Sequence, residues 1–254
     1  MKNFIKINII MLGILILTQS CVTKKEILYI QDDDLHFPLD LSYNDFTIQV
    51  DDILDIRVGA LIPETANPYN RGLLQTQTNI SLETMKLEGY LVSKNKTINF
   101  PVLGTLSVAN KSLIDLEKEL LKFFVDDGLL VNPTVTVRLI NGKVTILGEV
   151  NSPGTYSFTE NSISFLQALG LAGDLTINGN RDDVLLLRSL DGVLTTKHLN
   201  LTSADWLSER IMPNDVIIVN PNGSKIKSSA FFGNSSSLVA IASLIISTIV
   251  LILN

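Results

Sequence analysis

The sequence predicts an α+β protein made of two small mixed-sheet domains followed by a C-terminal transmembrane helix. Short stretches in which apolar and polar residues alternate recur through the middle of the chain, and turn residues separate them, which indicates strands. Residues 238–253 contain no charge and no proline, and with apolar neighbours this run approaches the roughly 20 residues that span a bilayer. Without the two chain ends roughly 210 residues remain, which suits two small domains.

The N-terminal end has the layout of a secretory signal. Two lysines precede an apolar stretch at 7–17, and small and polar residues follow up to Ser20. Cys21 is the only cysteine, so it forms no internal disulfide, and its place after a small residue resembles a bacterial lipobox. We expect residues 1–20 to be a lipoprotein signal peptide, Cys21 to carry the lipid and 21–44 to be a linker. A plain cleaved signal and an uncleaved anchor are the alternatives.

The first domain, expected at 45–140, opens with alternating apolar residues over 46–58. Asp51 and Asp52 interrupt the alternation, so the segment predicts a strand, a turn and a second strand. Residues 59–88 are polar and contain two prolines, which predicts a long surface excursion, and loops of that length are often functional.

A hairpin and a helix are expected next. Residues 90–92 and 97–100 flank Asn95 and predict the hairpin. Ser112 precedes an apolar pattern and has Asp115 three residues later, which is the signature of a capping box. The residues expected on the buried face of this helix are Leu113, Leu116, Leu120 and Phe124.

The boundary between the domains falls near an Asn-Gly pair. Residues 135–139 predict a strand, and Asn141 with Gly142 either closes a hairpin onto 144–146 or forms a linker turn between the domains. Both interpretations agree with the sequence.

The second domain, expected at 141–222, repeats the strand-and-helix style of the first. Residues 144–150 predict a strand, and Pro153 with Gly154 suits the centre of a type II turn. A short helix at 163–172 is expected to end at Gly173, with either Ile163, Leu166 and Leu169 or Phe165, Leu169 and Ala172 on its buried side. The remaining expected elements are strands at 184–188, 195–199 and 216–219, with a turn at Asp191 and Gly192.

Composition gives little support to catalysis or to nucleic-acid binding. The net charge of −6 disfavours a nucleic-acid partner. The chain has only two histidines, and no metal-ligand spacing, phosphate-binding glycine loop or nucleophile elbow occurs in it. We interpret the acid pairs Asp51–Asp52 and Asp182–Asp183 as turn residues and Asp32–Asp34 as part of a solvated linker. No catalytic residue, metal site or cofactor is expected.

Several motifs occur in one order. The first domain opens with FTIQVDDILDIRV at 46–58 and continues with GYLV, INFPVLG and NPTVTV; the second carries VTILGEVNSPGTY at 144–156, FLQALGLAG at 165–173 and MPNDVI at 212–217. These motifs resemble the polysaccharide export domain and the soluble-ligand-binding β-grasp (SLBB) domain of the Wza-like bacterial polysaccharide-export outer-membrane lipoproteins. KEILYIQD at 25–32 is similar to the start of Bacteroides-type members.

The motif residues have a structural interpretation. Gly148, Pro153, Gly154 and Gly173 are interpreted as backbone-geometry residues rather than sugar contacts. Glu149 and Arg188 are interpreted as solvated or structural, with contact to sugar or to a neighbouring subunit as the alternative. Only one SLBB copy fits this length, whereas longer relatives have two.

The resemblance also implies a ring, octameric in the family, that passes polysaccharide through the outer membrane and meets an inner-membrane co-polymerase or tyrosine kinase. The tail carries a stripe of small residues that falls within a sector of about 80° on a helix and suits close helix packing and a wet lumen. The stripe consists of Ser229, Gly233, Ser236, Ala240, Ser243 and Ser247. We expect 223–254 to form this helix, the lipid to sit in the inner leaflet and the folded domains to lie in the periplasm.

A second hypothesis is a lipid-anchored periplasmic adaptor that binds polysaccharide or the co-polymerase while another protein forms the pore. In that case the stripe serves only helix packing, or the tail is a passive anchor. Removal of 229–254 discriminates the two hypotheses, because an adaptor keeps some export.

Overall fold

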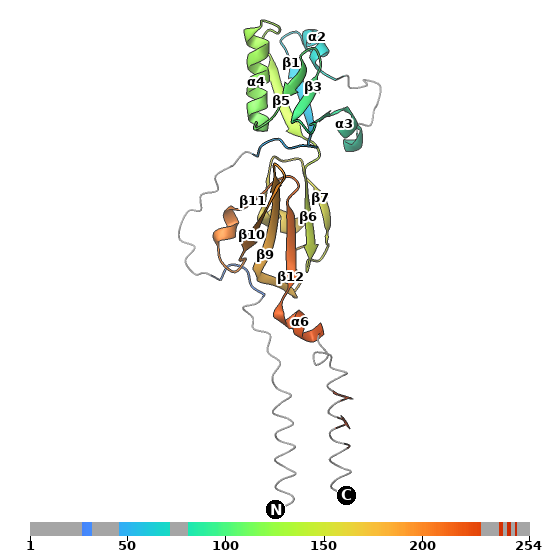
Figure 1. Ribbon diagram of the computed structural model, residues 1–254, viewed down its shortest axis with the longest axis vertical. Helices are drawn as coiled ribbons and strands as arrows, with labels where there is room; N and C mark the ends of the chain where they lie inside the picture. Colours follow the sequence, from blue (N-terminus) through green and yellow to red (C-terminus); the bar gives the residue numbers. More distant parts are fainter. Residues whose placement is uncertain are drawn as a thin grey trace, which may run out of the picture.

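Two α+β domains lie end to end in the computed structural model, which describes residues 27–31, 46–71, 81–229, 239, 240, 243, 244 and 247 (Figure 1). Each domain has its own hydrophobic core: one is formed by residues between Phe46 and Leu139, the other by residues between Val144 and Val219. The α+β class predicted from the sequence is confirmed for both domains.

The first domain combines a three-stranded sheet, a hairpin and one long helix. The sheet order is β2-β1-β5, and all its pairs are antiparallel. The strands are β1 (Ile53–Gly59), β2 (Tyr90–Leu91) and β5 (Thr134–Leu139), and the hairpin is β3 (Thr97–Phe100) with β4 (Gly104–Ser107). A mixed sheet was predicted here, but every described strand pair of this domain is antiparallel.

Helix α4 (Leu113–Asp126) forms as the sequence predicts and lies along β5 (Figure 1). The Ser112 hydroxyl accepts the Asp115 N–H at 3.1 Å, and the Asp115 carboxylate accepts the Ser112 N–H at 3.1 Å, which completes the capping box. The four residues expected on its inner face are all buried.

Two predictions for this domain are wrong. The predicted strand at 46–50 makes only one bridge, between Thr47 and Ser112, because the chain turns immediately afterwards at Asp51, whose φ is 67°. The predicted hairpin of 90–92 with 97–100 forms only at its turn, where the Ser93 N–H donates to the Thr97 carbonyl at 2.9 Å. Beyond that turn β2 pairs with β1, and β3 pairs with β4.

The predicted excursion at 59–88 is more ordered than expected. It contains α2 (Pro63–Ala66), the 3-10 helix η2 (Asn67–Tyr69) and α3 (Leu82–Glu88). Ala66 and Tyr69 are buried in the domain core, so this segment contributes to packing.

The second domain is a five-stranded mixed sheet, ordered β10-β9-β12-β6-β7, in which only β12 and β6 are parallel. Its strands are β6 (Lys143–Gly148), β7 (Gly154–Ser157), β9 (Gly179–Leu190), β10 (Val193–Leu199) and β12 (Val216–Pro221). The other elements are β8 (Ile163–Ser164), which pairs with β11 (Arg210–Ile211), α5 (Phe165–Leu171), η3 (Asp205–Ser208) and α6 (Gly223–Ser229). The turn at Asp191 and Gly192 between β9 and β10 is confirmed, with both residues at positive φ.

The Asn-Gly pair forms the linker turn, because β5 and β6 belong to different sheets. The Asn141 side chain accepts the Ile53 N–H at 2.8 Å and donates to the Asp51 carbonyl at 2.9 Å, which ties the linker to the start of β1.

Of the two buried faces predicted for helix α5, the structure has the second. Phe165, Leu169 and Ala172 are buried, whereas Leu166 is 54% exposed. Gly173 has the expected positive φ of 71°. The predicted type II turn at Pro153 and Gly154 is wrong, because Gly154 lacks the positive φ that this turn needs and begins β7 instead.

In the motif at 144–156 the residue with a positive φ is Gly148, at 93°. A Cβ there would stand 2.0 Å from the Val219 carbonyl oxygen of the parallel strand β12. The acid pair Asp182–Asp183 lies inside β9, so its interpretation as turn residues is also wrong.

Both ends of the chain fall mainly outside the described residues. Residues 1–20, Cys21, Gly233 and Ser236 lie there, as does most of the predicted transmembrane segment. Within the described ranges no helix has the length and apolar character to cross a membrane. Ser229 ends α6, and Ala240, Ser243 and Ser247 are helical; the Ser243 hydroxyl donates to the Ala240 carbonyl at 2.8 Å.

Candidate functional site

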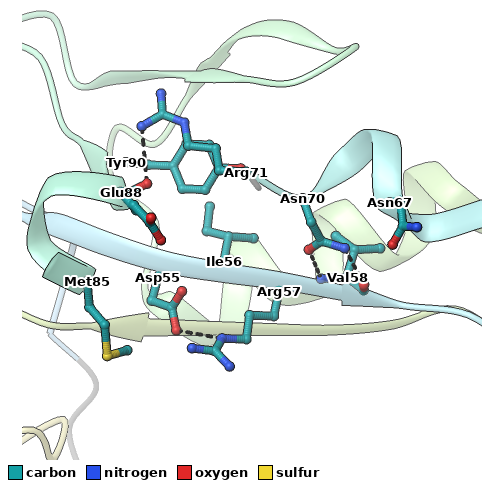
Figure 2. Close-up of a pocket in the computed structure, with 10 residues that line it drawn as sticks. All are labelled: Asp55, Ile56, Arg57, Val58, Asn67, Asn70, Arg71, Met85, Glu88 and Tyr90. Atoms are coloured by element: carbon teal, nitrogen blue, oxygen red, sulfur yellow. Dashed lines mark hydrogen bonds and ion pairs between the residues drawn. The ribbon is translucent and has the colours of Figure 1, made fainter. Parts of the chain in front are cut away.

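A cavity of about 350 Å³ opens along one edge of β1 in the first domain (Figure 2). Its walls are β1 itself, η2 with Asn70 and Arg71 after it, the end of α3 and the first residue of β2. The long polar segment at 59–88, whose length suggested a function, thus supplies two of these walls.

The cavity exists because β1 is only partly covered on this edge. Strand β2 pairs with Ile53 and Leu54 and goes no further. Four residues further along β1, at Val58, the Asn70 side chain makes the hydrogen bonds that a neighbouring strand would make. It accepts the Val58 N–H at 2.9 Å and donates to the Val58 carbonyl at 2.8 Å. Between these two contacts no described residue pairs with the edge of β1.

Ile56 occupies the open position. Opposite it on β5, the Val137 N–H donates to the Glu117 carboxylate at 2.7 Å and so points away from β1. In an antiparallel pair this makes Ile56 and Val137 a non-hydrogen-bonded pair, so the Ile56 N–H and C=O face the cavity edge. In the described part of the chain no group pairs with them.

Tyr90 and Arg71 form the wall beside this edge (Figure 2). The Arg71 guanidinium carbon lies 4.3 Å from the Tyr90 ring centroid, and Nη1 donates to the Gly89 carbonyl at 2.7 Å. The Phe100 ring stacks with the Tyr90 ring, with centroids 5.4 Å apart. Both contacts restrict the orientation of the tyrosine ring.

The Tyr90 hydroxyl is the unusual group of this wall. The residue is 2% exposed and its hydroxyl is closed off from solvent; among the described residues only the Arg71 main chain lies close to it, without the geometry of an ordinary hydrogen bond. Burial raises the pKa of Tyr90 more than the neighbouring Arg71 lowers it, so the phenol stays neutral and protonated near pH 7. A buried hydroxyl without a partner is unfavourable unless a ligand or water completes it.

Charges at the cavity are balanced. Asp55 accepts Nε of Arg57 at 2.9 Å, and the two side chains stand next to each other on one face of β1. Glu88 adds a second carboxylate and Arg71 a second guanidinium. The cavity therefore offers donors and acceptors in a mixed field rather than a strongly cationic or anionic one.

The residues singled out in the second domain have structural partners. Arg188 forms a two-pronged ion pair with Asp215, and Glu149 accepts the Thr176 hydroxyl at 3.0 Å. His198 pairs with Asp183 across β10 and β9 at 2.6 Å. Among the described residues no three His, Cys, Asp or Glu side chains converge on a possible metal position.

Residues 27–31 pack on the second domain. The Ile30 and Gln31 N–H groups donate to the carbonyls of Leu201 and Thr202 at 3.1 and 2.7 Å. The Tyr29 hydroxyl donates to Asp174, and the ring lies under the Arg181 guanidinium at 5.0 Å. This segment thus joins the sequence just after Cys21 to the folded protein.

Sequence reasoning missed Asn70, Arg71 and the hydroxyl of Tyr90 as site groups. Tyr90 was noted only as part of a motif, and the other two lie in the polar excursion. A polar stretch of unusual length was the only available signal, because the cavity depends on where β2 stops along β1.

Two family profiles match the chain in succession. The family described as polysaccharide biosynthesis/export protein matches residues 41–140, and the SLBB domain matches residues 142–219. Among curated proteins, the EPS I polysaccharide export outer membrane protein EpsA of Ralstonia solanacearum is 26% identical over 143 residues, covering 54% of this chain and 37% of the relative. EpsA of Ralstonia nicotianae is 30% identical over 106 residues, covering 40% and 27%. The matched chain thus spans well under half the length of these relatives.

Proposed function

Because this chain belongs to the Wza-like bacterial polysaccharide export family, we propose that it acts in the outer membrane as a subunit of an oligomeric channel through which a polysaccharide leaves the cell. The observation that carries the proposal is the succession of an export domain and an SLBB domain, each with its own core, directly before an apolar tail. Membership of the Bacteroides-type subgroup stays a prediction.

The tail supports the pore part of the proposal. Its small residues recur on one side of a helix, and the described positions Ala240, Ser243 and Ser247 are helical. Ser243 donates its hydroxyl to the carbonyl three residues earlier, which is how serines are satisfied in membrane helices. Repeated around a ring, such a stripe would face either the lumen or the neighbouring helix.

The chain ends set the proposed orientation. Cys21 would hold the protein to the inner leaflet of the outer membrane, with both folded domains in the periplasm. An octameric ring and an inner-membrane co-polymerase partner follow from the family resemblance, and a single SLBB layer would give a shorter vestibule than in longer relatives. The absence of a metal, cofactor or catalytic site belongs to the same proposal.

A deletion of 229–254 tests the proposal in cells. The lipid signal is kept, so the truncated chain still reaches the membrane, and export is measured as cell-surface polysaccharide. A channel subunit loses export completely, whereas an adaptor retains part of it and keeps its partner. Retained export would refute the pore assignment.

A matched pair of variants then separates pore lining from packing. Ser243→Leu with Ser247→Leu fills the small-residue stripe, and Ile245→Leu with Ile249→Leu places leucines on the opposite face of the helix, where they leave side-chain volume and polarity almost unchanged. Purified protein in lipid bilayers should lose conductance with the first pair only. Equal conductance in both would show that the stripe does not form the wall.

A further inference from the structure

We propose that one face of the sheet in the second domain binds helix α5 of a second copy of this chain, so that copies assemble head to tail. The inference rests on the proposed function, because it names the subunit contact of the oligomeric channel. We call this surface the outer sheet face. It consists of side chains on β6, β9 and β12, namely Leu147, Leu185, Leu187, Val216 and Ile218.

The two faces of this sheet differ in what covers them. The inner face carries the second core, which includes Val184, Leu186 and Ile217, and α5 and η3 contribute Phe165 and Trp206 to it. Along each strand the outer residues alternate with these core residues, so they point away from the core. They are half-buried or exposed and belong to neither hydrophobic core. Since α6 lies beyond the end of β12, no described helix covers the outer sheet face (Figure 1).

The outer sheet face is one contiguous apolar surface. In the strand registers, Ile218 of β12 lies between Leu185 of β9 and Leu147 of β6. Val216 lies beside Leu187 in the next row. The patch therefore spans the three central strands of the sheet, including its parallel pair of β12 and β6.

The strand sequences also indicate burial on both sides. β9 reads VLLL at 184–187 and β12 reads VIIV at 216–219, with no polar residue at the outward positions. Strands with one solvated face alternate apolar and polar residues, whereas continuous apolar runs are typical of strands that are covered on both faces. We therefore infer that a further layer covers the outer sheet face in the assembled protein.

The opposite side of the same domain carries a helix surface of matching character. On α5, Leu166 is 54% exposed and Leu171 is 42% exposed. Gly170 is also exposed, and a Cβ added there would meet no atom within 4 Å in the described part of the chain. Glycine is unfavourable inside a helix, and nothing in its surroundings here requires it. Its lack of a side chain would allow the sheet of a neighbour to approach α5 closely.

The placement of the two surfaces suits a ring. Because they lie on opposite sides of one domain, each copy offers a different surface to each neighbour, and such a contact closes into a ring where the rotation allows it. β9 and β12 run along the long axis of the molecule, and α6 leaves at one end (Figure 1). Neighbours that meet across the sheet therefore stand side by side with α6 at the same end, as subunits in one membrane must.

The proposed contact is small. Three strands about 4.8 Å apart, covered over four or five residues, give roughly 200 Å², well below the roughly 800 Å² that each partner buries in a standard interface. One such contact is weak, so closure of the ring and the other parts of the chain must support it. The test therefore uses the full-length protein in its membrane.

Cysteine cross-linking in isolated outer membranes tests the contact. Two variants, Gly170→Cys and Ile218→Cys, are produced in the same cells and treated with a short bismaleimide. We expect a link between position 170 of one copy and position 218 of the next. Neither variant alone should form a dimer, because a head-to-tail contact does not bring identical positions together. The wild type shows any background from Cys21.

Gly170→Leu tests the close approach and leaves the domain folded. At concentrations below assembly, the urea midpoint followed by Trp206 fluorescence should stay the same or rise, because leucine is the better helix former and has space here. The protein concentration at half assembly in detergent should rise about ten-fold or more, as expected for an overpacked contact. Lys122→Leu is the control: it adds an exposed leucine to α4 in the first domain and should leave assembly unchanged.

The outcomes separate this inference from the proposed function. Absence of the link between positions 170 and 218, or a Gly170→Leu protein that assembles like the wild type, overturns the contact. A dimer formed by Ile218→Cys alone also overturns it, because two sheets would then pack face to face. None of these results bears on export, which the tail deletion measures independently. If the link forms and the tail deletion leaves export intact, the subunit contact stands and the channel assignment fails.

Discussion

Arg188 is expected to be essential for the stability of the second domain. Its Nε donates to Asp215 Oδ1 at 3.0 Å, while Nη2 donates to Asp215 Oδ2 at 2.7 Å and to the Arg210 carbonyl at 2.7 Å. The Asp215 carboxylate is 1% exposed and also accepts the Met212 N–H at 2.8 Å. The pair therefore joins β9 to β11 and to the turn that precedes β12.

Arg188→Leu leaves a buried carboxylate without its counterion. Breaking a buried pair in this way lowers the free energy of unfolding by about 3–5 kcal/mol, a large part of the roughly 5–15 kcal/mol that a domain has. We expect the lower end, about 3 kcal/mol, because the Arg188 side chain is 18% exposed and water screens part of the interaction.

The loss should depend on pH. Burial raises the pKa of Asp215 and the contacts with Arg188 lower it, so removing Arg188 raises that pKa further. A carboxyl whose folded pKa lies above its unfolded value contributes stability at low pH that is lost as the pH rises through the folded pKa. The variant should therefore be closer to the wild type at pH 5 than at pH 8.

Urea unfolding followed by fluorescence measures this effect in one domain. Trp206 is the only tryptophan, is 2% exposed and lies in the second core. His198→Leu is the control, because its 66% exposed side chain pairs with the 44% exposed Asp183 and should matter by less than about 1 kcal/mol. Arg188→Leu with Asp215→Asn should recover part of the loss. An Arg188→Leu midpoint equal to the wild type would refute the reasoning.

Three further predictions concern backbone geometry, burial and capping. Gly148→Ala should lower the free energy of unfolding of the second domain by several kcal/mol, because the added Cβ would meet the Val219 carbonyl and alanine is strained at this positive φ. The melting temperature should fall accordingly, and an unchanged value would contradict this. Burial raises the pKa of Asp52 from 3.8 to about 6, which corresponds to about 3 kcal/mol of stability that is present below pH 4 and lost as the pH rises through 6. Asp52→Asn should therefore raise the hydrogen-exchange protection factors of the β1 amides at pH 7.5 and flatten their dependence on pH between 4 and 8, and protection factors with the same pH profile in both proteins would count against it. Ser112→Ala should lower the stability of the first domain by about 1 kcal/mol through loss of the cap on α4, measured by calorimetry, with no change if the cap is unimportant.

Local signals in the sequence were sufficient where the structure depends on nearby residues. The capping box at Ser112 and Asp115 predicts where α4 starts, and with the start known the apolar spacing gives its buried face. Asp191 and Gly192 both adopt positive φ, which their residue types favour, and the hairpin of β9 and β10 forms around them. In each case propensity and tertiary packing agree.

Pairing between distant strands was where the predictions failed. β2 follows a hairpin-like pattern, but it pairs with β1, some 37 residues earlier in the chain. Asn70 then completes the edge that β2 leaves uncovered, a contact that neither residue type nor spacing announces. The cavity is a consequence of these two long-range events, so its groups resembled ordinary loop and strand residues when viewed along the sequence.

The two ends of the folded part of the chain lie on the same domain. Residues 27–31 pair with 201–202, and α6 follows β12, so both ends of the described chain leave from the second domain. If Cys21 carries the lipid, the six residues to Ile27 reach at most about 20 Å, which holds the second domain near the bilayer. The first domain lies beyond it, at the far end of the molecule (Figure 1).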